Sequence, residues 1–245
     1  MRILICNDDG IESSGLKALA EKLSDKNEIL VIAPEGNRSA CSHTLTVRES
    51  IQITEYGKIK GCKSFSISGS PADCVKIAIH IFSDFVPDVV ISGINKGHNL
   101  GSDIMYSGTV AIAYEAAFFG IPSFAFSAFS HGESDFDLYS DFAAEILYKL
   151  YPFTDKNGIW NVNFPDSDLD VKGTKFTPLG TKVYIDEYVK DSDGRYRIYG
   201  VVDESTEFSD CDIEWNKRGY ITITPLKYDK SDYDLLKIIG EKCIL

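Results

Sequence analysis

Two adjacent aspartates directly after a short apolar run constrain this chain more than any other feature of its sequence. Residues 3–6 (ILIC) are typical of a strand buried on both faces, and the run ends at once in NDDG, residues 7–10. Adjacent carboxylates repel each other, so a folded chain keeps both ionised most easily when a cation or several donors lie between them. The pair is therefore interpreted either as part of a metal site or as a plain strand-to-helix turn, with an aspartate as the N-cap of the next helix.

Further apolar runs alternate with segments of helical spacing along the first two thirds of the chain. Buried strands are predicted at residues 28–33, 88–92, 122–127 and 159–164. Helices are predicted after residue 10, after Ser70, after Ser107 and over residues 135–150, the last with Leu138, Phe142, Ile146 and Leu150 inward. Residues 44–53 and 63–68 suggest an inserted hairpin. This alternation predicts an α/β fold with a doubly wound, mostly parallel sheet.

The pattern changes near residue 166, which divides the chain into a catalytic domain, residues 1–165, and a smaller β-rich portion, residues 166–245. In the second portion, residues 182–188 and 196–202 flank Asp193-Gly194, a hairpin turn signal. Another strand is expected within residues 215–226 and a short helix over residues 232–239. The aromatic residues of this portion are typical of a surface that contacts another subunit, so it is predicted to serve oligomerisation.

Charge and cysteine usage limit the classes of partner. The formal net charge of −12 argues against a nucleic-acid polymer, because binding phosphate backbones needs a basic face. The six cysteines contain no C-x-x-C pair and are interpreted as buried free thiols in a reducing cytoplasm. Neither a signal peptide nor a long apolar span is visible, so a cytoplasmic protein without a membrane partner is expected.

Oxygen-bearing side chains follow three of the predicted parallel strands. Asp8 and Asp9 follow the first strand, Ser39 the second, and Asn95 the strand at residues 88–92. Taken alone, Ser39 is equally a turn hydroxyl and Asn95 a capping residue. The carboxyl ends of parallel strands lie at one edge of a sheet, so the four side chains are expected to meet there. Such an all-oxygen set predicts one divalent cation per subunit, Mg²⁺ or Mn²⁺.

The helix that opens at Ser107, Gly108 and Thr109 begins at the same edge. Free N–H groups and the positive end of the helix dipole favour an anion there, although Ser107 also fits a plain N-cap. A cation beside an anion-binding helix terminus indicates phosphoryl chemistry. The glycine-rich segment also holds His98, a candidate for contact with a substrate. No P-loop, G-x-G-x-x-G or G-x-S-x-G motif is present.

Seven segments in order make the chain resemble the SurE survival-protein family of nucleotidases over nearly its full length. They are NDDG (residues 7–10), APEGNRSA (33–40), GSPADC (69–74), SGINKGHNLGSD (92–103), YSGTVAIAYEA (106–116), NVNFP (161–165) and GYITITPL (219–226). The resemblance implies a Rossmann-like domain and a homodimer or homotetramer assembled through the C-terminal portion, sometimes with exchanged segments. Lys96, His98 and Ser70 depart from the family pattern, which leaves substrate preference open.

The resemblance also implies a function and a set of site residues. The implied activity is divalent-metal-dependent hydrolysis of nucleoside 5′-monophosphates, with 3′-monophosphates and short polyphosphate as open extensions. The implied metal ligands are Asp8, Asp9, Ser39 and Asn95. The resemblance also implies that Asn37 contacts the phosphate, together with the turn formed by Ser107, Gly108 and Thr109. Asp8 and Asp9 are the catalytic candidates, with Asp9 orienting or deprotonating the attacking water. The alternative is a non-catalytic, metal-dependent nucleotide or phosphate sensor; since no ligand is missing, the enzyme is favoured.

Overall fold

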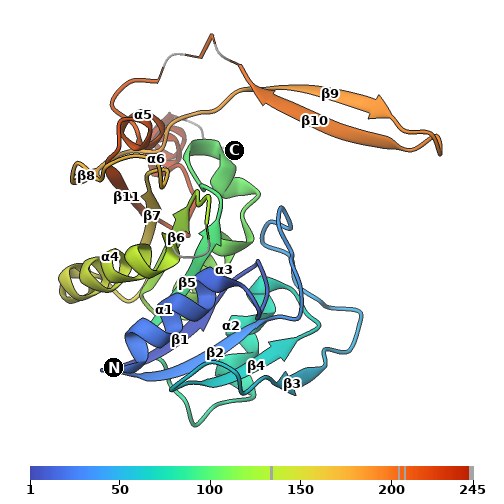
Figure 1. Cartoon of the computed structure of the whole chain (residues 1–245). Coiled ribbons are helices and arrows are strands. Elements are labelled where there is room, and N and C mark those ends of the chain that lie inside the picture. The colour runs from blue at the N-terminus through green and yellow to red at the C-terminus, as the bar shows by residue number, and fades with distance from the viewer. Residues whose placement is uncertain (133–134, 204, 207, 243–245) are drawn as a thin grey trace.

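A nine-stranded, mostly parallel sheet forms the centre of the computed structural model, which describes residues 1–132, 135–203, 205–206 and 208–242 (Figure 1). The strands lie in the order β3 (Ile53–Glu55), β4 (Lys63–Ile67), β2 (Glu28–Pro34), β1 (Arg2–Cys6), β5 (Val89–Lys96), β6 (Ser123–Ala128), β7 (Ile159–Phe164), β11 (Ile221–Leu226) and β8 (Thr174–Phe176). From β4 to β7 all neighbours are parallel. The predicted doubly wound α/β fold is confirmed.

The chain reverses its direction of travel across the sheet between β1 and β5. From β1 it moves outward through β2 to β4, then returns to β5 and moves outward on the other side through β6 to β7. Where the loops after two neighbouring parallel strands run in opposite directions, a crevice forms at the carboxyl ends of those strands. NDDG follows β1 and Asn95 lies near the end of β5, so both border this crevice.

Helices cover both faces of the sheet, and the alternation of side chains along β1 explains why both faces are apolar. Ile3 and Ile5 pack in a core with α1 (Ser14–Ser24) and α4 (Asp135–Leu150). Leu4 and Cys6 pack in a second core with α2 (Pro71–His80) and α3 (Gly108–Phe118). A strand whose successive residues are all buried needs such a layer on each side.

Two helix starts settle interpretations that the sequence left open. Ser13 is the N-cap of α1, its Oγ accepting the Leu16 N–H at 3.3 Å, so neither aspartate caps that helix and the interpretation of an aspartate as the N-cap is wrong. Ser70 caps α2 in a capping box with Asp73, and Pro71 stands at its first turn, as expected.

Two expectations about the first domain are wrong in detail. Residues 44–52 form no strand, because Asp73 accepts the N–H of Thr46 at 3.1 Å and Ser70 donates to the carbonyl of Thr44 at 2.6 Å. Only β3 remains to pair with β4, in antiparallel fashion. In α4, Leu138 is 54% exposed, and Tyr139 is buried in its place, while Ile146 is buried and Phe142 and Leu150 pack partly buried against the core as predicted.

The C-terminal portion contributes to the main sheet as well as standing outside it. β11 pairs with β7 in antiparallel fashion and β8 pairs with β11, so the sheet continues past residue 165 and the proposed domain division stays a prediction. The expected hairpin is present as β9 (Tyr184–Lys190) and β10 (Tyr196–Val202), which project away from the body (Figure 1). The strand expected within residues 215–226 is β11 (Ile221–Leu226), and it follows the helix α5 (Asp212–Lys217).

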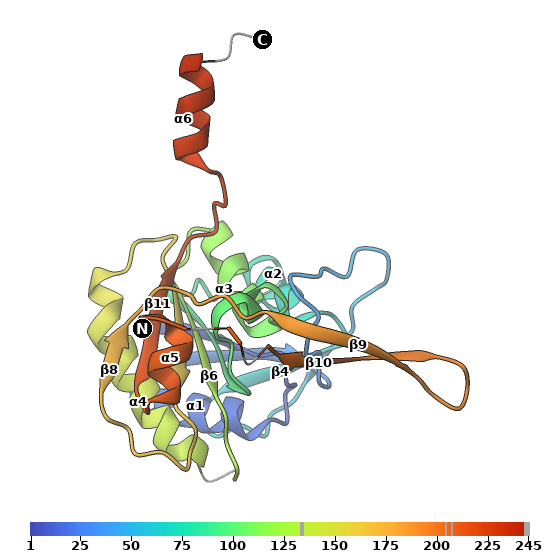
Figure 2. The ribbon, with the colours of Figure 1, turned by 90° about the horizontal axis from the view of Figure 1, so that it is seen from above.

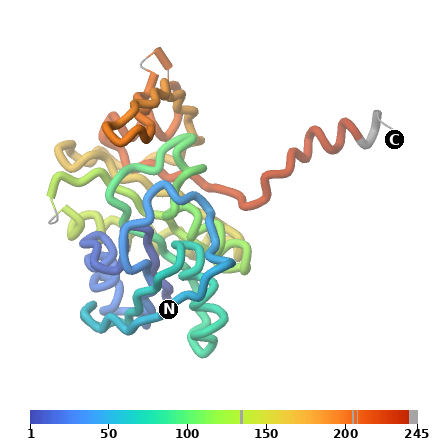
Figure 3. The backbone as a smooth tube through the Cα atoms, turned by 90° about the vertical axis from the view of Figure 1, so that its right-hand side faces the viewer, coloured from blue at the N-terminus to red at the C-terminus, as the bar shows by residue number. Residues whose placement is uncertain are grey.

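The last helix, α6 (Tyr233–Lys242), stands apart from the body at the end of an extended arm (Figures 2 and 3). Across the described ranges, no helix combines the length and apolar character that a membrane span requires. The five cysteines in those ranges are free: Cys6, Cys74 and Cys211 are buried, Cys41 and Cys62 half-buried. Cys243 lies outside the described residues.

Asp212 joins the C-terminal portion to the glycine-rich segment after β5. Its buried carboxylate accepts the N–H groups of Gly101 and Gly180, both at 2.7 Å, and that of Ile213 at 2.9 Å. Gly101 begins the short 3₁₀ helix η1 (Gly101–Met105), which leads into α3; a second short 3₁₀ turn, η2 (Tyr151–Phe153), follows α4. Asp212 therefore sets the position of the loop that precedes α3.

Replacing Asp212 is expected to destabilise the whole fold. In Asp212→Ala, three buried N–H groups lose a charged acceptor, so the free energy of unfolding in urea should fall by about 3 kcal/mol. Asp168→Ala, which removes an exposed carboxylate elsewhere in the C-terminal portion, should change it by less than about 0.5 kcal/mol. Equal stability of the two variants would contradict the role given to Asp212.

Candidate active site

The turn after β1 is built by Asn7 and Gly10. Asn7 donates from Nδ2 to the Gly10 carbonyl at 2.9 Å and to Ser13 Oγ at 2.8 Å, and its Oδ1 accepts the Gly10 N–H at 3.2 Å. Gly10 has a φ of 103°, and a Cβ there would lie 3.0 Å from the backbone of Gly36. Because Asn7 and Gly10 hold the turn, the side chains of Asp8 and Asp9 are free for other contacts.

Asp8 lies against the first turn of α3. Thr109 Oγ1 donates to Asp8 Oδ1 at 2.5 Å, and Ser107 caps the helix by accepting the Val110 N–H at 3.1 Å. Gly108 allows this contact, because a Cβ at that position would lie 2.8 Å from both Cβ and Oδ2 of Asp8. The buried carboxylate is thus held at the positive end of a helix that provides N–H groups without intrahelical partners.

The acidic pair carries unfavourable electrostatics that a cation would relieve. Burial raises the pKa of Asp8 to about 6, the charge of Asp9 adds to the increase, and the hydrogen bond from Thr109 opposes it. Burial also raises the pKa of Asp9, against the Lys96 backbone N–H and the Lys96 charge. A divalent cation between two such carboxylates lowers both pKa values and restores their ionised form.

Asp9 joins the loop that follows β2 to the end of β5. Its Oδ2 accepts the backbone N–H of Lys96 at 2.9 Å, and its Oδ1 accepts from Asn37 Nδ2 at 3.3 Å. Asn37 Oδ1 in turn accepts the Ser39 N–H at 2.8 Å, and the Arg38 N–H donates to the Asp8 carbonyl at 2.7 Å. The loop that carries Asn37 and Ser39 is therefore fixed directly to the acidic pair.

Asn95 reaches the site because β5 is irregular near its end. The pairing of β5 with β6 shifts between Ser92 and Asn95, and Gly93 lies so close to β6 that a Cβ would be 2.3 Å from the Phe126 carbonyl oxygen. Asn95 Nδ2 donates to the Gly97 carbonyl at 2.8 Å. With its nitrogen engaged, the side-chain oxygen is the group of Asn95 that can ligate a cation.

A single pocket of roughly 530 Å³ joins residues from all of these loops. Of the predicted site residues, Asp8, Ser39, Asn95 and Ser107 line it. The remaining four adjoin those: Asn37 accepts the Ser39 N–H and donates to Asp9, which follows Asp8 in the chain, and Gly108 and Thr109 contact Asp8. The structure therefore brings together the whole predicted set at the carboxyl edge of the sheet.

The donor set fits a hard cation. It offers two carboxylates, an amide oxygen and a hydroxyl, the ligand types that Mg²⁺ and Mn²⁺ prefer. In the described ranges, no three His, Cys, Asp or Glu side chains gather as a metal site, so zinc-type coordination finds no equivalent there.

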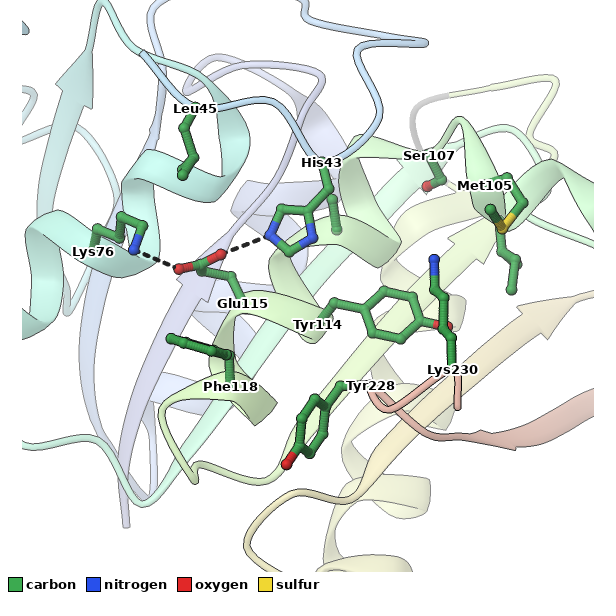
Figure 4. A pocket seen from close by; sticks show the side chains of 12 residues that line it. His43, Leu45, Lys76, Met105, Ser107, Tyr114, Glu115, Phe118, Tyr228 and Lys230 are labelled. Atoms are coloured by element: carbon green, nitrogen blue, oxygen red, sulfur yellow. Dashed lines mark hydrogen bonds and ion pairs between the residues drawn. The ribbon is translucent and has the colours of Figure 1, made fainter. Parts of the chain in front are cut away.

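A cluster of His43, Glu115 and Lys76 fixes the chain just after Ser39 to α3 and α2. His43 Nε2 lies 2.6 Å from Glu115 Oε2 on α3, and Lys76 Nζ on α2 lies 2.9 Å from Glu115 Oε1. The three side chains meet at a neighbouring pocket of roughly 340 Å³, with Tyr114, Phe118 and Met105 around it and Ser107 shared with the first pocket (Figure 4). The sequence analysis did not identify this cluster, because its members are distant in sequence.

Buried asparagines hold the glycine-rich segment against β7. Asn163 Oδ1 accepts the Asn99 N–H at 2.8 Å, and Asn161 and Asn163 donate to the Asn99 carbonyl at 2.8 and 3.1 Å. Asn99 Nδ2 donates to Ser127 Oγ at 2.8 Å. The signal was present in the sequence: amides at alternate positions of the buried strand IWNVNF indicate a polar function on one of its faces.

One wall of the pocket comes from the hairpin, for which the sequence predicts only a role in oligomerisation. Tyr184 and Asp186 on β9 and Ile198 on β10 line it, together with Tyr106. His98 also lines the pocket, but its Nε2 lies 2.9 Å from the Phe164 carbonyl, so that nitrogen donates to the backbone. Burial lowers the pKa of His98, which favours the neutral imidazole.

Comparisons with known proteins identify relatives of this chain. The profile of the family described as "Survival protein SurE" matches residues 3–186. A protein named 5′-nucleotidase SurE from Thermoanaerobacter sp. (strain X514) is 39% identical, covering 98% of this chain and 97% of that protein. One of the same name from Clostridium botulinum (strain Eklund 17B / Type B) is 40% identical over 95% of this chain and 96% of its own. The crystal structure of the SurE protein from Aquifex aeolicus superposes with a TM-score of 0.82 at 33% identity, covering 98% of each chain.

Filling the space at Gly108 is expected to displace the Asp8 carboxylate. Gly108→Ala should weaken Mn²⁺ binding by about tenfold or more in isothermal titration, because the added methyl group overlaps the ligand. Gly36→Ala is the matched control, since a Cβ at Gly36 meets nothing within 4 Å in the neighbouring loop. Unchanged Mn²⁺ affinity in Gly108→Ala would show that Asp8 is not held as described.

Proposed function

The chain belongs to the SurE family, and we propose that it is a divalent-metal-dependent 5′-nucleotidase that hydrolyses nucleoside 5′-monophosphates to nucleoside and phosphate. Its similarity to proteins named 5′-nucleotidase SurE supports the reaction class. The observation that carries the proposal is the Asp8 carboxylate held on the first turn of α3, in one pocket with Ser39, Asn95 and Ser107. An acidic group and an anion-binding helix terminus in contact suit a cation and a phosphate bound side by side.

We assign the metal ligands to Asp8, Asp9, Ser39 and Asn95. Mg²⁺ or Mn²⁺ held there would polarise the phosphoryl oxygens and make a bound water more acidic. The chain itself keeps the ligands in place: Thr109 fixes Asp8, Lys96 and Asn37 fix Asp9, and Gly97 fixes Asn95.

The phosphate is assigned to the first turn of α3 and to Asn37. The Thr109 hydroxyl and backbone N–H both face the Asp8 carboxylate and the Val110 N–H donates to Ser107, so the Gly108 N–H is the donor that α3 offers to an anion. Asn37 contacts both Asp9 and Ser39, which places its amide beside the proposed cation. These donors would neutralise charge on the phosphoryl oxygens as the ester bond breaks.

Asp9 is the residue that we propose orients the attacking water. Its two oxygens accept hydrogen bonds from different loops, so its carboxylate has a fixed direction. A rigid carboxylate beside the phosphate can align a water in line with the leaving ester oxygen and accept its proton. Hydrolysis of 3′-monophosphates and short polyphosphate would use the same residues, since both present a terminal phosphoryl group.

The composition supports a small nucleotide as the substrate. A net charge of −12 disfavours long nucleic acids, while the exposed Lys96 in the pocket supplies one local cation for a phosphate. Free thiols at five cysteines support a cytoplasmic location.

Removing one carboxylate is expected to abolish turnover. Asp8→Asn should lower Mn²⁺-dependent release of phosphate from AMP by more than about 100-fold. Mutating a residue that only hydrogen-bonds to a metal ligand already lowers metal affinity or activity by about 10- to 100-fold, and Asp8 is proposed as a ligand itself. EDTA should abolish the wild-type activity and added Mn²⁺ should restore it. Asp25→Asn, at the exposed end of α1, should retain full activity.

Two results would contradict this proposal. Full activity of Asp8→Asn with Mn²⁺ would remove the acidic pair from the reaction. Tight AMP binding by the wild-type protein without phosphate release would favour a nucleotide sensor over an enzyme.

We further propose that the protein is a homodimer or homotetramer assembled through its C-terminal portion. The helix α6 has an exposed apolar face that includes Leu235, Ile238 and Ile239, and it stands away from its own body (Figure 3). Contact with another subunit would bury this exposed apolar surface. The hairpin projects in a different direction and offers a second contact (Figure 2).

Charges on this face are expected to dissociate the assembly. Sedimentation velocity should show a dimer or tetramer for the wild type and a 27.2 kDa monomer for the double variant Leu235→Asp/Ile239→Asp. Lys237→Ala, which changes a charged residue of the same helix, should keep the wild-type mass. A wild-type protein that sediments as a monomer would contradict the assignment.

A further inference from the structure

We propose that the hairpin wall of the active-site pocket, formed by Tyr184, Asp186 and Ile198, binds the nucleobase of the substrate, and that Asp186 makes the enzyme select guanine. This inference rests on the proposed nucleotidase function and concerns the half of the substrate that does not react. It gives β9 and β10 a role in substrate recognition.

The composition of the pocket supports a ligand with two different parts. One wall carries Asp8, Ser39, Asn95 and Ser107, which suit a cation and a phosphate. The hairpin wall carries an aromatic ring, an aliphatic side chain and one carboxylate in the same pocket of roughly 530 Å³, a volume typical of sites for small organic ligands. When the phosphate of a nucleotide is bound at the first wall, its ribose and base can extend to the second wall.

The pairing of the hairpin strands turns these side chains to one face. Side chains two residues apart in a strand share a face, so Tyr184 and Asp186 lie together on β9. Gly200 is the partner of Asp186 on β10, and Ile198 lies on the same face two residues away. A Cβ at Gly200 would lie 2.8 Å from Asp186 Oδ1, so the glycine leaves space in which the carboxylate can lie across the hairpin.

The root of the hairpin is fixed beside the phosphate site. Tyr184 donates from its hydroxyl to Asp103 Oδ1 at 2.7 Å, and Lys182 Nζ donates to Asp103 Oδ2 at 2.5 Å. Lys182 also donates its backbone N–H to Ser102 Oγ at 3.1 Å. Ser102 and Asp103 belong to η1, which leads into α3, so the ring of Tyr184 is held at a set position relative to the phosphate-binding turn.

The chemistry of Asp186 discriminates between purine bases. An ionised carboxylate only accepts hydrogen bonds. The Watson–Crick edge of guanine presents two neighbouring N–H donors, N1–H and N2–H, which match the two carboxylate oxygens. The same edge of adenine presents one donor and one acceptor, so its N1 lone pair would face an oxygen. Flat bases of either kind can pack on Tyr184 and Ile198, which leaves Asp186 as the group that separates them.

The test compares kcat/KM for GMP and AMP in the presence of Mn²⁺. We expect the wild type to prefer GMP by about tenfold, the lower end for a bidentate base contact, because Asp186 is exposed. Asp186→Asn presents one acceptor and one donor, which match adenine, so the GMP-to-AMP ratio should fall by about tenfold. Glu187→Gln removes the same charge from the next residue, on the opposite face of β9, and should leave the ratio unchanged.

Ribose 5-phosphate, which has no base, separates this inference from the proposed function. All three proteins should hydrolyse it equally. An unchanged GMP-to-AMP ratio in Asp186→Asn, or an equal loss for both nucleotides, would overturn base selection while the nucleotidase function stands. If no substrate releases phosphate, the proposed function fails, and isothermal titration with guanosine and adenosine still decides the inference: an Asp186-dependent preference for guanosine supports it and equal affinities overturn it.

Discussion

The repulsion between Asp8 and Asp9 is the constraint on which the site depends. Neighbouring carboxylates at the end of a buried strand are costly unless donors or a cation meet their charge. The chain supplies the donors from three separate places, Thr109 on α3, Lys96 at the end of β5 and Asn37 after β2. Each contact brings another loop to the same edge of the sheet. The acidic pair therefore organises the loops around it, and the remaining unfavourable charge favours binding of a divalent cation.

The sequence was sufficient for features that depend on local pattern. Short apolar runs located the parallel strands, Ser70 and Pro71 located a helix start, and the common carboxyl edge of parallel strands brought Asp8, Ser39 and Asn95 to one pocket, although Asn95 lies within β5 and not in the loop predicted after residue 92. These predictions succeeded because parallel strands have an obligatory common edge.

Features that depend on contacts between distant residues were beyond the sequence. The loop at residues 44–52 has the composition of a strand, but Ser70 and Asp73 use its backbone groups. In the sequence, Asp212 is not distinguished from other acidic residues, although its carboxylate accepts three backbone N–H groups in the structure. Composition likewise indicated an interface at the hairpin, while only the three-dimensional arrangement puts Asp186 in the active-site pocket.

The central claim is that Asp8, Asp9, Ser39 and Asn95 hold one divalent cation beside an anion at the start of α3. Its most direct test is anomalous diffraction at the manganese edge from crystals grown with Mn²⁺ and inorganic phosphate. The account predicts one strong manganese peak per subunit among these four side chains, with phosphate density between it and the backbone of Gly108 at the start of α3. A manganese peak bound elsewhere, or phosphate density away from α3, would contradict it.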